Sequence, residues 1–166
     1  MDCTDRLRWS VVAVLVASYV AFGCPDAMLP GGASYAVRAS VYPFFHANLW
    51  HLVINCIAVW GVFAPGRWNW RDVLVASLVS FLVYPLSFRP VVGMSNLIYA
   101  TIGLRTPAFS SRWWKSRNVI IFVAVTCAMA FVPQFSATTH IAAFVAGVTV
   151  SLFRRRINKI YKEAGL

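Results

Sequence analysis

The stretch HANLWHLVIN, residues 46–55, opens an apolar segment that continues to Phe63. If this segment is a helix, His51 and Asn55 are four residues apart and project from the same face. The chain has three histidines, and the one outside this stretch, His140, lies in another apolar segment. Imidazole and carboxamide groups are costly inside a bilayer, so they normally face the protein interior and mark a functional site.

The composition of the 166-residue chain is typical of a membrane protein. Apolar residues make up 60% of it and charged residues 12%, and the mean hydropathy is +0.68. In soluble domains about a quarter of the residues are charged. The net charge of +10 would suggest a nucleic-acid partner for a soluble chain. Here the charge lies between apolar segments, and we expect the partner to be the lipid bilayer and not nucleic acid.

Six apolar segments predict an all-α membrane protein with six transmembrane helices, forming a single domain over residues 1–166. Most segments are shorter than the roughly 20 residues that cross a bilayer comfortably, so flanking tryptophan and arginine side chains must extend them at headgroup level. The segments are 9–22, 49–63, 73–88, 96–104, 119–132 and 139–153. If the first segment were a cleaved signal peptide, five spans would remain and the alternation of basic connections would be lost. We therefore expect this segment to be a transmembrane helix.

The basic residues predict the orientation of the chain. Of the fifteen lysines and arginines, all but Arg38 and Arg89 lie at the two ends or in the second and fourth connections. By the positive-inside rule, both termini are expected in the cytoplasm and the odd-numbered connections outside. We expect a multi-pass protein of the plasma (inner) membrane, with the basic tail over residues 154–162 touching anionic lipid.

The fourth segment is expected to be a short central helix. Pro90 and Gly93 oppose helix before Ser95, and Pro107 follows, which leaves about ten residues, or roughly 15 Å of helix. The loop before it would then descend into the membrane, where it must be buried in protein or line a water-filled cavity. Ser95 would stand at a helix N-terminus, whose free backbone N–H groups favour developing negative charge.

Four polar residues in the apolar segments supply the parts needed for acyl transfer. Ser95 would be the nucleophile, and His140 would be its base because imidazole exchanges protons near neutral pH. His51 and Asn55 would donate hydrogen bonds to the oxyanion. The five acidic residues lie at segment ends or in connections, so the catalytic unit would be a serine–histidine dyad.

The spacing of small residues predicts that the fourth and sixth segments pack closely. Ser95, Tyr99 and Gly103 repeat every four residues, and His140 and Gly147 share a face of the sixth segment. Small residues let transmembrane backbones approach. A tyrosine ring between the two segments could hold the histidine in place.

Over about residues 45–153, the chain resembles the rhomboid intramembrane serine proteases. The motifs that carry the resemblance are His46 with His51-Leu-Val-Ile-Asn55, Gly93-Met-Ser95-Asn96 with Tyr99 and Gly103, and His140-Ile-Ala-Ala143 with Gly147. They are similar to the family's His-x-x-x-Asn, Gly-x-Ser-Gly and His-x-x-Gly-x-x-x-Gly. All three occur in the family's order and on the expected spans, which makes the resemblance specific.

The resemblance implies a serine endopeptidase that cleaves transmembrane segments of other membrane proteins, with no cofactor and no metal. It implies that water reaches the site from the outer face and that Tyr99 packs on His140. The roles it implies are nucleophile for Ser95, general base for His140, oxyanion hole for His51 and Asn55, and support for Tyr99, His46, Gly93 and Asn96.

The chain departs from the family pattern in three places. Asn96 replaces the glycine after the nucleophile, where it could obstruct substrate or donate one more hydrogen bond. Ala143 replaces a glycine where the fourth and sixth segments pack, which could push them apart by a methyl group. The first outward connection, residues 24–45, lacks the Trp-Arg pair common in relatives and keeps only Arg38.

Three other functions are alternatives to serine proteolysis. An inactive rhomboid-like protein that binds transmembrane helices is the alternative that Asn96 favours. A metalloprotease or haem protein could use three histidines, but an intramembrane metalloprotease also needs a carboxylate, and the apolar spans hold none. A transporter would be expected to show intramembrane charge or an inverted repeat, and the sequence shows neither.

Overall fold

The computed structural model describes residues 3–23, 35–62, 70–86, 92–106, 126 and 136–165. All regular structure in these ranges is helical, as predicted. The elements are α1 (Cys3–Phe22), α2 (Tyr35–Val41), η2 (Tyr42–Phe44), α3 (Leu49–Val62), α4 (Trp70–Val83), η3 (Tyr84–Leu86), α5 (Ser95–Arg105) and α8 (Ala137–Glu163). Among them, α8 is long and apolar enough to cross a membrane by itself. The predicted fifth span, 119–132, lies outside the described residues except for Thr126, so the count of six spans stays a prediction.

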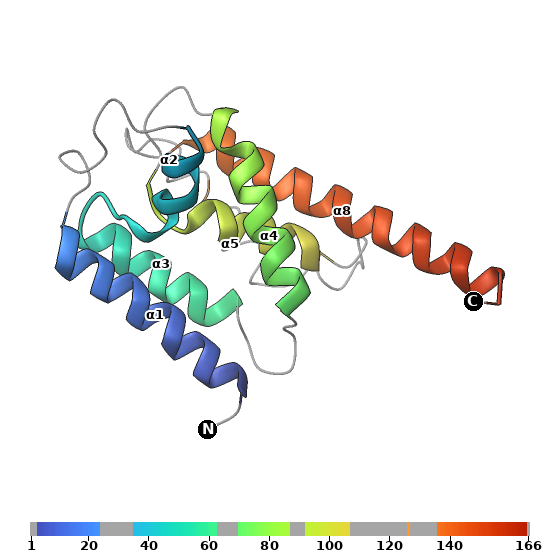
Figure 1. Cartoon of the computed structure of the whole chain (residues 1–166), viewed down its shortest axis with the longest axis horizontal. Helices are drawn as coiled ribbons and strands as arrows, with labels where there is room; N and C mark the ends of the chain where they lie inside the picture. The colour runs from blue at the N-terminus through green and yellow to red at the C-terminus, as the bar shows by residue number, and fades with distance from the viewer. Residues whose placement is uncertain are drawn as a thin grey trace.

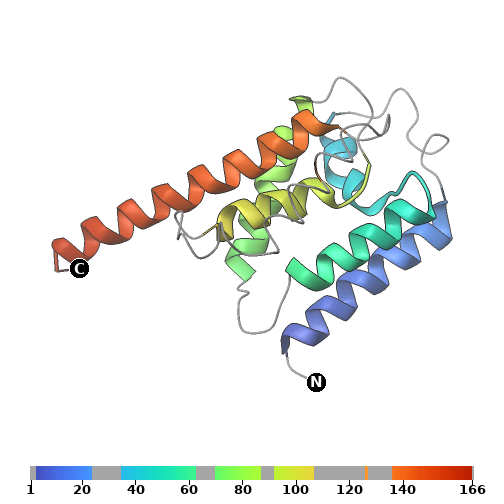
Figure 2. The same ribbon diagram turned by 180° about the vertical axis from the view of Figure 1, so that it is seen from behind.

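Helix α5 lies at the centre of the arrangement. It packs against α8, α4, α3 and η2, while α1 packs against α3 on the far side. In Figures 1 and 2, α1 and α3 form an antiparallel pair, and α5 lies between this pair and α8. The same views place the starts of α3, α5 and α8 at one end of the molecule, next to α2. Polar residues at these three helix starts are therefore brought together.

The bounds of α5 agree with the short helix expected for the fourth segment. It has 11 residues, which corresponds to roughly 16 Å, about half the thickness of the hydrocarbon core. Nine of these residues are buried, including the polar Ser95, Asn96 and Thr101. The chain enters the helix through Gly93, whose φ of +98° lies in a region that side chains strongly disfavour.

Helices α5 and α8 touch through their backbones. A Cβ atom added to Gly103 would lie 2.2 Å from the Phe144 carbonyl oxygen, and one added to Gly147 would lie 2.3 Å from the Ala100 carbonyl oxygen. No side chain fits at either position. The small-residue faces predicted for these segments therefore meet, and the fully buried Ala143 is accommodated between the helices.

A cation–π contact joins the first turns of α1 to the last turn of α3. Arg8 is only 6% exposed, and its guanidinium carbon lies 5.0 Å from the centroid of the Trp60 ring. It also pairs with Asp5 at 3.2 Å. Arg8 precedes the first predicted span, 9–22, in the sequence, but the structure places it inside α1, which begins six residues earlier than that span. Contact with the Trp60 ring offsets part of the cost of burying the charge.

Helix α8 is longer than the apolar segment that predicts it, ending at Glu163 and not near residue 153. The basic tail is therefore helical, which suits its arginines and lysines because these are good helix formers. Arg154 pairs with Asp72 in the first turn of α4 at 2.7 Å. Beyond this pair, the last turns of α8 project from the rest of the molecule (Figure 1).

Candidate active site

Ser95 and His140 meet where α5 and α8 begin. The Ser95 Oγ and the His140 Nε2 atoms are 2.6 Å apart, which is a short hydrogen bond between residues 45 positions apart in the chain. The serine is 8% exposed and the histidine 2% exposed. The two groups proposed from the sequence as nucleophile and base are thus in direct contact in a buried position.

A backbone carbonyl orients His140 from its other side. The imidazole Nδ1 hydrogen-bonds to the carbonyl oxygen of Ser136, one turn earlier at the start of α8. Because a carbonyl only accepts, this partner assigns the proton to Nδ1 and leaves the lone pair on Nε2 facing the Ser95 hydroxyl. Ser136 could not be identified from the sequence, since any residue at that position would supply the same carbonyl.

Tyr99 packs against the His140 ring. Its ring and the His140 ring are nearly perpendicular, at 73°, with centroids 4.8 Å apart. The Tyr99 hydroxyl hydrogen-bonds to Thr126 Oγ1 at 2.7 Å. This edge-on contact restricts rotation of the imidazole, and Thr126 in turn holds the tyrosine.

His51 and Asn55 both lie against the loop just before Ser95. A Cβ atom on Gly93 would lie 2.6 Å from His51 Cε1, 2.7 Å from His51 Nε2 and 3.1 Å from Asn55 Nδ2. Two side-chain nitrogens from α3 thus flank a glycine two residues before Ser95. The Asn48 side chain fixes the start of α3 by accepting the His51 backbone N–H at 2.8 Å. Asn48 is a typical helix N-cap residue that is not among the predicted site residues, although its position just before the apolar run is a recognisable signal.

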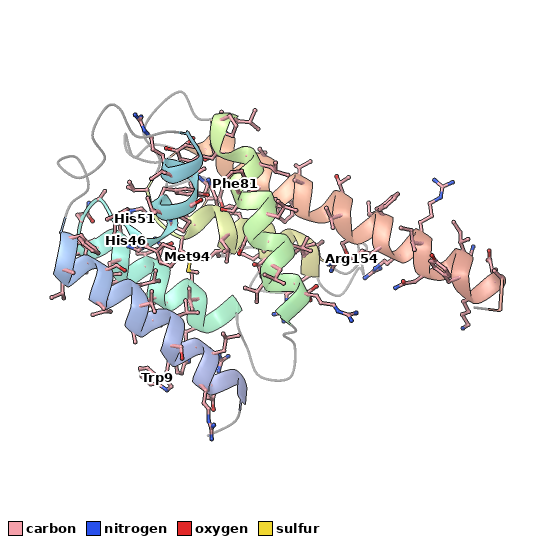
Figure 3. The ribbon with its side chains drawn as sticks, in the orientation of Figure 1. Trp9, His46, His51, Phe81, Met94 and Arg154 are labelled. Carbon is pink, nitrogen blue, oxygen red and sulfur yellow. The ribbon has the colours of Figure 1, made fainter. Side chains whose placement is uncertain are left out.

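His46 lies beside His51, with ring centroids 5.3 Å apart, and Figure 3 shows the two at the start of α3. It is fully buried, and neither ring nitrogen has a hydrogen-bond partner among the described residues. Burial lowers the pKa of His46 from 6.5 to about 4, with a smaller contribution from His51 and a smaller opposing one from the Phe44 backbone. His46 is therefore neutral at pH 7.

This pKa predicts that acid destabilises the protein through His46. Between pH 6.5 and about 4, the unfolded chain binds a proton at this residue that the folded protein excludes. The free energy of unfolding should therefore fall as the pH is lowered through this window. A His46→Leu variant should lose that part of the dependence. The measurement is the difference in thermal stability between wild type and variant at several pH values, in which titrating groups that do not interact with His46 cancel. A difference that is the same at neutral and acidic pH would contradict the assignment.

The Asn96 side chain is engaged within the protein. The residue is fully buried, and its Nδ2 donates a hydrogen bond to the Tyr42 hydroxyl at 3.3 Å. Of the two effects considered from the sequence, an added hydrogen bond is present, but it reaches Tyr42 at the start of η2. In the described part of the chain, no three histidine, cysteine or acidic side chains gather as metal ligands would.

The described structure is thus that of a helical protein with a buried serine–histidine pair, flanked by amide and imidazole nitrogens from a third helix. A family model for the Rhomboid domain matches residues 71–157, just over half of the chain. The chain belongs to the rhomboid family, whose members are membrane proteins and include both intramembrane proteases and inactive relatives. Comparisons with curated proteins and with solved structures gave no match.

Proposed function

We propose that this protein is an intramembrane serine protease that cleaves transmembrane segments of other membrane proteins. The observation that carries the proposal is the 2.6 Å hydrogen bond between Ser95 Oγ and His140 Nε2. A hydroxyl held against the free lone pair of an imidazole is an activated nucleophile. The test is incubation of the purified protein in liposomes with a model transmembrane substrate, with the cleaved bond located by mass spectrometry.

The reaction proceeds in two halves. Ser95 Oγ attacks the scissile carbonyl carbon while its proton moves to His140 Nε2, and the protonated imidazole then gives this proton to the leaving amine. Water next attacks the acyl-enzyme ester while His140 takes one of its protons. The imidazolium then gives this proton to Ser95 Oγ as the ester C–O bond breaks and the carboxylic acid product leaves. The Ser136 carbonyl, which accepts from Nδ1, stabilises the imidazolium in both halves as a buried carboxylate does in a triad.

The oxyanion of each tetrahedral intermediate is stabilised by groups from two helices. The backbone N–H of Ser95 is free at the N-terminus of α5, where the helix dipole also favours negative charge. His51 and Asn55 supply side-chain donors from α3, since both lie against Gly93. These donors are in place before reaction, so they need little reorganisation as charge develops.

Removing either side-chain donor should slow catalysis strongly. His51→Ala and Asn55→Ala are each expected to lower kcat by about 10²–10³-fold, the usual effect of losing one oxyanion donor, with a smaller change in KM. Ile57→Ala, on the exposed side of the same helix, is the matched control and should stay near wild type. Turnover of the two variants within twofold of wild type would remove these residues from the oxyanion site.

We further propose that the chain forms a single domain of six transmembrane helices in the plasma membrane, with both termini in the cytoplasm. Leu74, Leu78 and Leu82 form an exposed stripe along one face of α4, which suits contact with lipid. The proposed site lies at the end of the bundle where α3, α5 and α8 begin, and Arg154 of α8 lies toward the other end (Figure 3). The positive-inside rule then places the site toward the outer face.

The second candidate is an inactive rhomboid relative that binds transmembrane helices without cutting them. The observation that favours it is Asn96, which places a buried side chain where the related motif has glycine. A fluorophosphonate probe separates the two candidates. Covalent labelling at Ser95 supports the protease, and a folded protein that is never labelled supports the inactive relative.

A further inference from the structure

Tyr42 holds the nucleophile segment at two points, one on each side of Ser95. Its backbone carbonyl accepts the N–H of Gly93 at 2.9 Å, and its hydroxyl accepts the Nδ2 hydrogen of Asn96 at 3.3 Å. Tyr42 is fully buried at the start of η2, in a part of the chain more than 50 residues before the nucleophile. One residue of the first outward connection therefore forms hydrogen bonds to the start of α5 both before and after Ser95.

Tyr42 is itself anchored to α4. Its hydroxyl donates to Ser80, where both the carbonyl oxygen, at 3.2 Å, and the Oγ atom are within reach. Its ring packs on Tyr84 with centroids 4.8 Å apart. Ser80 is buried as well. We call Tyr42, Ser80 and Asn96 the Tyr42 clamp, and it joins η2, α4 and α5 through hydrogen bonds that are costly to lose in a buried site.

The clamp and His140 are held by different contacts. The distance between α5 and α8 is set by Gly103 and Gly147, and His140 is oriented by the Ser136 carbonyl. Tyr42 instead forms its hydrogen bonds to α5 and the loop before it through Gly93 and Asn96. Gly93 is the residue that lies against His51 and Asn55. What the clamp determines is therefore the position of the nucleophile segment relative to the oxyanion donors of α3.

We propose that Tyr42 and Asn96 are positioning residues that hold the Gly93–Ser95 segment against the oxyanion donors. The proposal rests on the proposed protease function and deepens it, since it assigns a role to the asparagine that replaces glycine in this chain. Neither residue takes part in bond making. Their loss lets the segment shift, and a misplacement of about 1 Å at a reacting centre can cost about 100-fold in rate.

The experiment compares Tyr42→Phe, Asn96→Ala, their double variant and Ser80→Ala in liposomes with a transmembrane substrate. Active sites are titrated with a fluorophosphonate so that kcat refers to competent enzyme only. We expect Tyr42→Phe and Asn96→Ala each to lower kcat by about 10–100-fold with KM within about twofold. The double variant should be no worse than the poorer single one, because both remove the same hydrogen bond. Ser80→Ala should cost less, since the Ser80 carbonyl still accepts the Tyr42 hydroxyl.

Two controls separate positioning from a general loss of structure. Tyr161→Phe, on the exposed tail of α8, should leave kcat unchanged. A purely structural role for the clamp would lower the titrated fraction of active protein while kcat per titrated site stayed at the wild-type value. That result, or full turnover by both Tyr42→Phe and Asn96→Ala, would overturn the proposal.

Amide hydrogen exchange tests the clamp without relying on activity. Tyr42→Phe and Asn96→Ala should both speed exchange in peptides covering residues 92–98 while leaving residues 140–150 at the wild-type rate. Unchanged exchange over 92–98 would overturn the proposal. If wild type itself is neither labelled nor active, the protease function fails, and the exchange data alone then decide whether Tyr42 and Asn96 hold the segment.

Discussion

Replacing Ser95 with alanine is expected to abolish covalent labelling by a fluorophosphonate and to lower substrate cleavage by at least about 10³-fold. The variant lacks the oxygen that we propose forms the acyl-enzyme, which is the Oγ atom that lies 2.6 Å from His140 Nε2. His140→Ala should cost about as much, because nucleophile and base act as a unit. Cleavage is measured in liposomes, and circular dichroism checks that each variant remains helical.

The matched control is Ser151→Ala, which removes a hydroxyl from α8 away from the site. It should be labelled and should cleave like wild type. Labelling or near-normal cleavage by Ser95→Ala would remove Ser95 as the nucleophile and leave the family membership untouched. Absence of labelling in folded wild type would instead favour the inactive relative that binds transmembrane helices.

Adding one methyl group at Gly147 should damage both stability and catalysis. The new Cβ would lie 2.3 Å from the Ala100 carbonyl oxygen and 2.9 Å from the Leu104 nitrogen. These are backbone atoms of α5 that cannot rotate away, so the two helices must separate. We expect Gly147→Ala to lower the free energy of unfolding by about 1–3 kcal/mol. Cleavage should fall by about 100-fold, because the Ser95–His140 hydrogen bond crosses the same interface.

Val145→Ile is the control for this second prediction, because it adds one carbon on an exposed face of α8. It should leave both stability and cleavage near wild type. Gly103→Ala tests the same interface from α5 and should behave like Gly147→Ala, since its Cβ would lie 2.2 Å from the Phe144 carbonyl oxygen. A stable, fully active Gly147→Ala protein would show that α5 and α8 are not in backbone contact.

Much of the fold could be predicted because it follows from local preferences. The start of α5 at Ser95 follows from Gly93, which takes a backbone conformation that only glycine adopts readily. The contact of α5 with α8 follows from Gly103 and Gly147, since small residues at helical spacing let transmembrane backbones meet. The sequence also predicted a pair formed by Ser95 and His140, and the structure places the two side chains within hydrogen-bonding distance. Their catalytic roles are a proposal.

Other parts of the site could not be predicted, for identifiable reasons. The Ser136 carbonyl that orients His140 is a backbone group, which every residue type supplies. Tyr42 reaches Ser80 and Asn96 across 38 and 54 positions of the chain. Neither α2 nor the helical form of the basic tail is predicted from the sequence, because α2 lies within the first connection and the basic tail carries no apolar periodicity beyond its role as an anchor.

By itself, the sequence determined that this is a helical membrane protein with a short buried helix beginning at Ser95, because helix breaks, apolar length and small-residue spacing act over a few neighbouring residues. Only the tertiary structure decided which groups surround that serine. The Ser136 carbonyl, the Tyr42 clamp and the direction of the Asn96 amide depend on how helices distant in the chain pack, and hydrogen bonds across such distances leave no periodic pattern in the sequence.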